Sequence, residues 1–273
     1  MKRMRNRLLS TTCLMAVAAV GGAQAADLPQ GYGGLPNYGD LPAVSQLNGK
    51  VAAFGGSQDG GLFGVTGSLT APLGHAFGAQ IDGMVGSGRS AAFYGVGGHL
   101  FWRDPAKGLL GLYGSYVSWD LHDGGTNGAN VGKVGVEGEA YLGRFTLEGL
   151  AAYQFATKTG FAGKAVVAYY PIDNLRFDGG VRYLEGPGAI GVVDAEWQPR
   201  IGSNWSLFAS GSFGDNYTQA LGGLRYYFGD SGKSLIQRHR QDDPGNSLPD
   251  DLFTTGCPTG TVFDGRRCDA YFE

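Results

Sequence analysis

The chain has 273 residues, of which 50 are glycine, whereas average usage of roughly 7% predicts about 19. Aromatic residues make up 12% of the chain, which argues against disorder, because their rings can bury a large apolar area. Charged residues make up only 16%, too few to solvate the surface of an ordinary soluble globule. We therefore expect something other than water to cover much of the folded surface.

Residues 1–25 have the pattern of a secretory signal peptide. An apolar stretch from Cys13 to Val20 leads to a small-residue site at Ala23-Gln24-Ala25, and we expect cleavage after Ala25. The alternative, an uncleaved anchor helix, is disfavoured because the stretch is short and ends in Gly21-Gly22. The basic residues before the stretch are Lys2, Arg3, Arg5 and Arg7. Removing these four leaves 17 bases and 24 acids, a formal charge of −7, which gives no support to nucleic-acid binding.

A Gly/Pro-rich linker at residues 26–46 precedes a long series of predicted β-strands. From 47 to 229, apolar and polar residues alternate with a period of two, which indicates strands with one apolar face. The twelve segments lie near 47–55, 62–73, 77–86, 93–102, 109–119, 131–142, 145–155, 163–170, 175–185, 189–197, 203–213 and 217–228. Most are close to the roughly 9 to 11 residues that a tilted strand needs to cross a bilayer. The sequence therefore predicts an all-β fold, an antiparallel transmembrane β-barrel of about 12 strands, with 10 as the alternative.

The connections between these segments alternate in character. One set consists of tight turns, such as Gly143-Arg144 and Pro171 to Asn174, which we assign to the periplasmic side. The other set includes the longest polar loop, His122 to Asn130, which we assign to the cell exterior. An even number of strands leaves the two ends of the barrel-forming chain on the same side of the membrane.

Aromatic side chains gather on the apolar face, at the strand ends beside the proposed periplasmic turns. Rings with polar handles favour the headgroup level of a bilayer, so we expect a girdle at the membrane interface. The predicted girdle comprises Phe77, Trp102, Phe145, Tyr169, Phe177, Trp197, Trp205 and Phe228. A large soluble β-sandwich or barrel is the alternative, and it is disfavoured because the polar face is the smaller and more enclosed one.

Three features together resemble the outer-membrane β-barrel, porin-like proteins of Gram-negative bacteria. They are the signal with its Ala25 to Pro29 junction, which is similar to alphaproteobacterial members, the series of strands, and the closing stretch Gly222 to Phe228. The closing stretch resembles the strand that the barrel-assembly machinery recognises. The resemblance implies outer-membrane localisation, contact with outer-membrane lipid and assembly by that machinery. In typical members the closing strand ends the chain, whereas here residues 230–273 follow it.

The polar face carries charges of both signs, which we expect to line the lumen. The predicted lining comprises the acids Asp82, Glu137, Glu139, Glu148, Asp178, Asp194 and Glu196, the bases Lys133, Lys164, Arg176, Arg182 and Arg225, and His99. Tight turns set Glu139 opposite Glu148, and Lys164 close to Arg182. Like charges opposite one another are destabilising unless they are bridged. We expect the arginines to reach across the lumen and neutralise the acids.

Two functions fit such a lumen. The first is passive passage of small polar solutes or ions through a narrow charged channel, with mild cation preference from the excess of acids. The alternative is a structural outer-membrane barrel whose lumen is closed by its own charged side chains. We predict no enzyme activity, and no catalytic residue, cofactor or metal. Facing carboxylates such as Glu139 and Glu148 fit sugar hydrolysis in principle, but charged lumens are common in barrels without chemistry.

Residues 230–273 form a tail for which three interpretations stay open. The composition favours a disordered periplasmic extension. The alternatives are a plug folded into the periplasmic mouth and a contact with a periplasmic or cell-wall partner. Cys257 and Cys268 are expected to form a disulfide, because export places them in an oxidising compartment.

Overall fold

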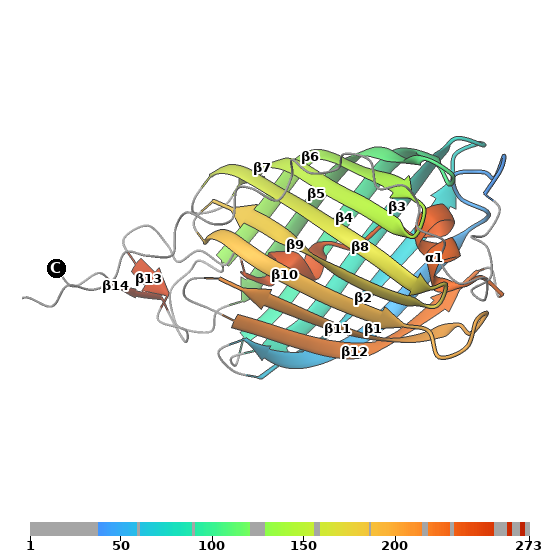
Figure 1. Cartoon of the computed structure of the whole chain (residues 1–273). Helices are drawn as coiled ribbons and strands as arrows, with labels where there is room; N and C mark the ends of the chain where they lie inside the picture. Colours follow the sequence, from blue (N-terminus) through green and yellow to red (C-terminus); the bar gives the residue numbers. More distant parts are fainter. Residues whose placement is uncertain are drawn as a thin grey trace, which may run out of the picture. The chain divides into compact units, whose positions relative to one another are not determined.

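A computed structural model describes residues 38–58, 61–88, 91–120, 129–155, 159–185, 187–214, 218–229, 232–253, 261–263 and 268–270. Strands β1 to β12 form one closed antiparallel barrel, in which sequence neighbours pair and β1 closes on β12 (Figure 1). The strands are β1 (Asn48–Gln58), β2 (Gly61–Pro72), β3 (Phe77–Gly88), β4 (Ala91–Asp104), β5 (Gly108–Asp120), β6 (Ala129–Leu142), β7 (Phe145–Phe155), β8 (Gly160–Ile172), β9 (Leu175–Leu184), β10 (Gly188–Trp197), β11 (Trp205–Phe213) and β12 (Thr218–Phe228). The predicted barrel of twelve strands is confirmed.

Strand β8 is longer than the predicted segment 163–170 at both ends, and at its carboxyl end it continues past Pro171. A proline lacks the N–H that a strand donates to its neighbour, so it usually marks the end of a strand or a bulge. Here the register between β8 and β9 shifts between Tyr169 and Ile172. This β-bulge accommodates the proline, and the strand ends at Ile172 instead of residue 170.

The outer face of the barrel is apolar. Ile81 is 64% exposed, whereas its neighbours Gln80 and Asp82 are buried, and the same alternation recurs along the other strands. The eight predicted girdle residues are all exposed on the outer face, and two of them, Phe145 and Tyr169, stack with ring centroids 4.7 Å apart. Their place at the membrane interface stays a prediction. Among the described residues, no helix is both long enough and apolar enough to cross a bilayer.

Glycine is required where neighbouring strands approach most closely. A Cβ atom at Gly180 of β9 would lie 2.1 Å from the carbonyl oxygen of Ala165 in β8, whereas a Cβ at Gly83 of β3 would meet no atom within 4 Å. Some of the glycines are therefore required by close contacts between strands, whereas at other positions a larger residue would fit.

We expect Gly180→Ala to lower the free energy of unfolding by about 1–3 kcal/mol through overpacking. Gly83→Ala should leave it unchanged or slightly raise it, because alanine restricts the unfolded chain. Urea unfolding of the refolded protein, followed by circular dichroism, measures both variants. Equal stability of the two would contradict this account of the strand contacts.

The tail departs most from the sequence analysis. Residues 233–253, which we call the lumen segment, run inside the barrel instead of forming a disordered extension outside it (Figure 1). The segment comprises helix α1 (Leu235–Gln237), the π-helical turn η1 (Arg238–Asp242), an extended stretch at 243–247 and the 3-10 turn η2 (Leu248–Phe253). Its buried apolar side chains, each 0% exposed, are Leu235, Ile236, Leu248 and Leu252. The tail has too few apolar residues to form a core of its own, so its composition suggested disorder. These residues form a core only together with the barrel wall.

Beyond the lumen segment, β13 (Thr261–Phe263) and β14 (Cys268–Ala270) pair with each other in a two-stranded sheet. Cys257 lies outside the described residues, so the Cys257–Cys268 disulfide stays a prediction. The predicted signal peptide and the first part of the linker, up to residue 37, also lie outside them.

Candidate functional site

Two glycines with positive φ angles lie between β12 and the lumen segment. Gly229 and Gly232 have φ angles of 110° and 112°, in the left-handed region that favours glycine. The amide of Ile236 then donates to the carbonyl oxygen of Asp173 in the turn between β8 and β9, at 3.0 Å. The Ile236 side chain packs on Tyr170. The segment is thereby fixed at the end of the barrel where each even-numbered strand turns into the next odd-numbered one.

Turn η1 is held by hydrogen bonds to the wall. The two ring nitrogens of His239 lie 2.9 Å from the hydroxyl of Tyr170 and 3.2 Å from that of Tyr227. Arg240 donates to the carbonyl oxygen of Gly143 at 2.7 Å. These contacts join η1 to strands β8 and β12 and to the turn between β6 and β7.

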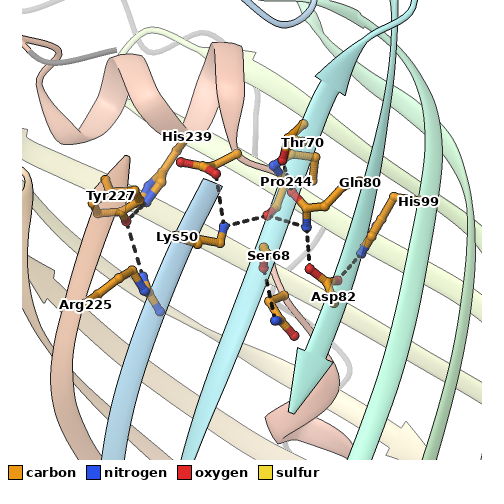
Figure 2. A network of polar contacts seen from close by, with 12 residues as sticks. Lys50, Ser68, Thr70, Gln80, Asp82, His99, Arg225, Tyr227, His239 and Pro244 are labelled. Atoms are coloured by element: carbon orange, nitrogen blue, oxygen red, sulfur yellow. Dashed lines mark hydrogen bonds and ion pairs between the residues drawn. The ribbon is translucent and has the colours of Figure 1, made fainter. Parts of the chain in front are cut away.

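The extended stretch contacts the first three strands (Figure 2). The carbonyl oxygen of Pro244 accepts from Lys50 Nζ at 2.9 Å and from Gln80 Nε2 at 3.3 Å. Asn246 Nδ2 donates to Ser68 Oγ at 3.2 Å. Polar side chains that point inward from β1, β2 and β3 thus hold the middle of the lumen segment.

Asp250 of η2 bridges two like charges on the wall. Lys164 of β8 and Arg182 of β9 pair directly across the two strands, as the sequence predicts. Such a pair is destabilising unless it is bridged. The Asp250 carboxylate lies 2.9 Å from Lys164 Nζ and 2.8 Å from Arg182 Nη1. The lumen segment therefore supplies a counterion to both charges, a source that the sequence analysis did not consider when it expected Arg182 to neutralise acids of the lumen lining.

Asp251, the next residue, binds a second set of wall groups. Its carboxylate forms an ion pair with Lys133 of β6 and accepts from Ser115 Oγ of β5 at 3.0 Å. The side chains of Lys133 and Asp251 are only 4% and 1% exposed, so this ion pair is almost completely buried.

An apolar cluster surrounds η2. Leu248 and Leu252 pack against wall residues near the end of the barrel opposite α1. These wall residues are Phe54, Leu62, Met84, Phe93, Val117, Trp119 and Leu221. The sequence analysis missed this cluster because apolar residues occur on both faces of these strands.

The predicted acids Glu148, Asp178 and Glu196 pair with bases of the wall. Arg176 Nη2 lies 2.8 Å from Glu148, and Arg176 Nε lies 2.7 Å from Asp178. Arg225 forms an ion pair with Glu196. Arg176 and Arg225 therefore neutralise acids of the same strand or of the next strand but one, whereas the sequence analysis expected them to reach across the lumen.

His99 lies between two carboxylates. Its Nε2 is 2.8 Å from Asp82 of β3 (Figure 2). Its Nδ1 is 2.8 Å from Glu137 of β6, so the imidazole of β4 links these two strands. Glu139 accepts a hydrogen bond from the hydroxyl of Tyr141 at 2.8 Å. Both nitrogens of His99 are engaged, which leaves neither to activate a nucleophile.

A cavity of about 170 Å³ lies between part of the lumen segment and the barrel wall. Two like-charged cross-strand pairs line it, Glu139 opposite Glu148 and Asp178 opposite Asp194. In all, seven acidic and five basic side chains, besides His239, line the cavity. The lining therefore carries two more acids than bases, apart from His239.

Two buried bases of the described barrel strands were missing from the predicted lining. Lys50 of β1 is 7% exposed and Arg103 of β4 is 1% exposed. Lys50 lies on the same face as Ala52 and Phe54, and these apolar neighbours obscured the inward direction of that face. Residues two positions apart in a strand point to the same face, so the spacing of Lys50 from Ala52 and Phe54 was the signal that Lys50 points inward.

Comparison with known proteins identifies the fold. No protein-family model and no curated protein matches the chain. A structure of the KdgM porin in complex with disordered oligogalacturonate matches it with a TM-score of 0.53 and 12% identity, over 66% of this chain and 99% of the porin. A second KdgM porin structure matches with a TM-score of 0.51 and 12% identity, over the same shares of the two chains. The chain has the fold of the outer-membrane porins.

The porin fold provides a closed wall around a lumen. In this chain, the residues that follow the closing strand fill much of that lumen, and the wall charges pair with them. At 12% identity the likeness concerns the fold alone, so the function has to be argued from the lumen itself.

Proposed function

We propose that this protein is a porin-like channel of the outer membrane that passes small polar solutes or ions and is blocked at rest by its lumen segment. The observation that carries the proposal is the way in which the segment is held. The barrel closes through β1 and β12 without it, whereas the segment is fixed by side-chain contacts with the wall. Such contacts can exchange with water or with a solute while the barrel stays intact.

The size of the barrel supports a channel. Eight strands leave an interior that side chains fill, and sixteen leave an open aqueous pore, so twelve strands leave a lumen that one additional segment can occupy. The KdgM porin, which shares the fold, is described as a porin. Export through a cleaved signal peptide, assembly by the barrel-assembly machinery and residence in the outer membrane belong to the same proposal, as does the absence of enzyme activity.

One observation favours the structural alternative. The apolar cluster around Leu248 and Leu252 is fully buried, as in the core of a permanently filled barrel. Recordings in planar bilayers distinguish the two functions. The channel predicts stepwise conductance that increases when the lumen segment is weakened. The complete absence of conductance, with residues 230–273 present or deleted, would leave only the structural barrel.

The acid excess of the cavity leads to a selectivity prediction. In the full-length protein, replacing Glu139 and Glu148 with glutamine should lower the preference for K⁺ over Cl⁻, because these carboxylates line the cavity. The reversal potential in a salt gradient measures the preference. Asp104→Asn is the matched control, because Asp104 pairs with Lys107 in a turn outside the lumen. An unchanged reversal potential would exclude the two glutamates as the filter.

A further inference from the structure

The lumen segment crosses the barrel from one mouth towards the other. At its beginning, Ile236 contacts Asp173 in the turn between β8 and β9, at the same end of the barrel as the end of β12, which we call the α1 end. At its end, Leu252 belongs to the apolar cluster that includes Leu62 and Trp119. Leu62 is the second residue of β2 and Trp119 is the last residue but one of β5, so both lie at the opposite end of the barrel. Turn η2 is therefore close to the opposite mouth.

The contacts between these two points advance steadily along the strands. Asn246 donates to Ser68, which lies four residues from the α1 end of β2. Asp251 accepts from Ser115, which lies seven residues from the α1 end of β5. Successive residues of the lumen segment thus lie deeper in the barrel, and residues 233–253 make a single passage along it.

The chain that follows η2 is long enough to leave through the opposite mouth. Ser115 lies five residues before the far end of β5, a distance of about 17 Å along the strand. Seven residues, 254–260, separate Phe253 from β13, and seven residues span at most roughly 25 Å. This length is enough for the hairpin of β13 and β14 to lie outside that mouth.

A return to the α1 end would need a second passage through an occupied lumen. Leu248 and Leu252 are 0% exposed and Asp251 is 1% exposed, so wall residues surround η2. A chain that ran back beside η2 would have to displace the leucines from their cluster or break the buried ion pair between Asp251 and Lys133. Either loss is costly, which favours exit over return.

We propose that the lumen segment carries residues 254–273 through the barrel, so that the hairpin of β13 and β14 lies on the side of the membrane opposite to the end of β12. With the tight turns on the periplasmic side, as the sequence predicts, the hairpin is displayed at the cell exterior instead of in the periplasm. The protein then has a second function, the presentation of a short module on the cell surface. This function goes beyond the proposed channel and holds equally for a permanently filled barrel.

Anchors at both ends of the lumen segment keep the hairpin in place. Near the α1 end, the ring nitrogens of His239 contact the hydroxyls of Tyr170 and Tyr227 at 2.9 and 3.2 Å. In η2, Asp251 pairs with Lys133. The segment cannot slide along the lumen without breaking these contacts, so a module attached to it is held at a fixed distance from the barrel.

The test is labelling of single cysteines on intact Gram-negative cells with a maleimide attached to polyethylene glycol, before and after the outer membrane is ruptured. The native cysteines of the mature chain are first replaced by serine. Asp269→Cys in β14 and Thr261→Cys in β13 report on the hairpin independently of each other. Lys107→Cys marks the α1 end, because this side chain is 77% exposed in the turn between β4 and β5. Asn127→Cys marks the opposite end, because residue 127 belongs to the connection between β5 and β6.

We expect both hairpin cysteines to be labelled together with Asn127→Cys and not with Lys107→Cys. In the predicted orientation this means nearly complete labelling on intact cells, whereas Lys107→Cys is labelled only after rupture. If the barrel faces the other way, the two reference positions exchange their behaviour and the hairpin should still follow Asn127→Cys.

Labelling of the hairpin together with Lys107→Cys would overturn the proposal, and so would hairpin cysteines that stay unlabelled on both sides of the membrane. Circular dichroism of each variant, purified from the outer-membrane fraction, checks that the barrel is folded. Labelling needs no ion current, so its result is separate from that of the bilayer recordings, which test the channel itself.

Discussion

The full-length protein with Asp250→Asn and Asp251→Asn should conduct at least several times better in a planar bilayer than the wild type. The two aspartates bind three cations of the wall, and the pair between Asp251 and Lys133 is almost completely buried. Breaking a buried ion pair by removing one partner costs about 3–5 kcal/mol, because the other charge is left uncompensated. Since about 1.4 kcal/mol changes an equilibrium tenfold, this loss shifts the lumen segment strongly toward the undocked state.

Single-channel amplitudes and open probabilities measure the effect. The control Asp104→Asn removes an acidic charge from an exposed turn and should behave as the wild type does. A folded double variant that conducts no better than the wild type would show that docking of the lumen segment does not limit the current.

The apolar anchors of η2 should have a comparable effect on docking. Leu248 and Leu252 are each 0% exposed, and truncating a buried leucine to alanine typically costs about 2–5 kcal/mol. The variant Leu248→Ala with Leu252→Ala should therefore release the lumen segment while the barrel, which closes through β1 and β12, stays folded. Hydrogen exchange followed by mass spectrometry should show faster exchange over residues 243–253 and unchanged exchange in the strands.

The matched control for this variant is Leu112→Ala, which truncates a leucine of the outer face that is 59% exposed. It should leave exchange in the lumen segment unchanged. If the double variant protects the segment as well as the wild type does, or exposes strands and segment together, then the segment is part of one cooperative core and is not a separable plug.

The sequence predicted the barrel because strand periodicity and cross-strand register are local properties. The turn at Gly143-Arg144 is enough to set Glu139 opposite Glu148, and the observed register agrees. The same reasoning placed Lys164 close to Arg182, and the observed register sets them directly opposite, a pair of like charges that is destabilising unless a counterion bridges it.

The source of that counterion was not predictable from local patterns. Asp250 reaches Lys164 and Arg182 only because residues 233–253 run along the lumen. The lumen segment has no sustained period of two or of 3.6, since its contacts point to all sides of the surrounding wall. The conformation of such a segment is determined by its contacts with the barrel wall. Its composition alone is therefore similar to that of a disordered tail.

A reversible cross-link between the lumen segment and the wall tests the central claim most directly. Ser68 Oγ and Asn246 Nδ2 are 3.2 Å apart, so cysteines at both positions lie within reach of a short thiol-reactive cross-linker that contains a reducible disulfide. The cross-link is placed in the variant that carries Asp250→Asn and Asp251→Asn, with the native cysteines of the mature chain replaced by serine. Mass spectrometry confirms the cross-link and its cleavage by a reductant.

The measurement is the bilayer conductance of this one protein in its cross-linked and reduced states. If the lumen segment blocks the channel, the cross-linked protein should conduct as poorly as the wild type, and a reductant should restore the high conductance of the double variant. Equal conductance in the two states, with the cross-link verified, would contradict the account.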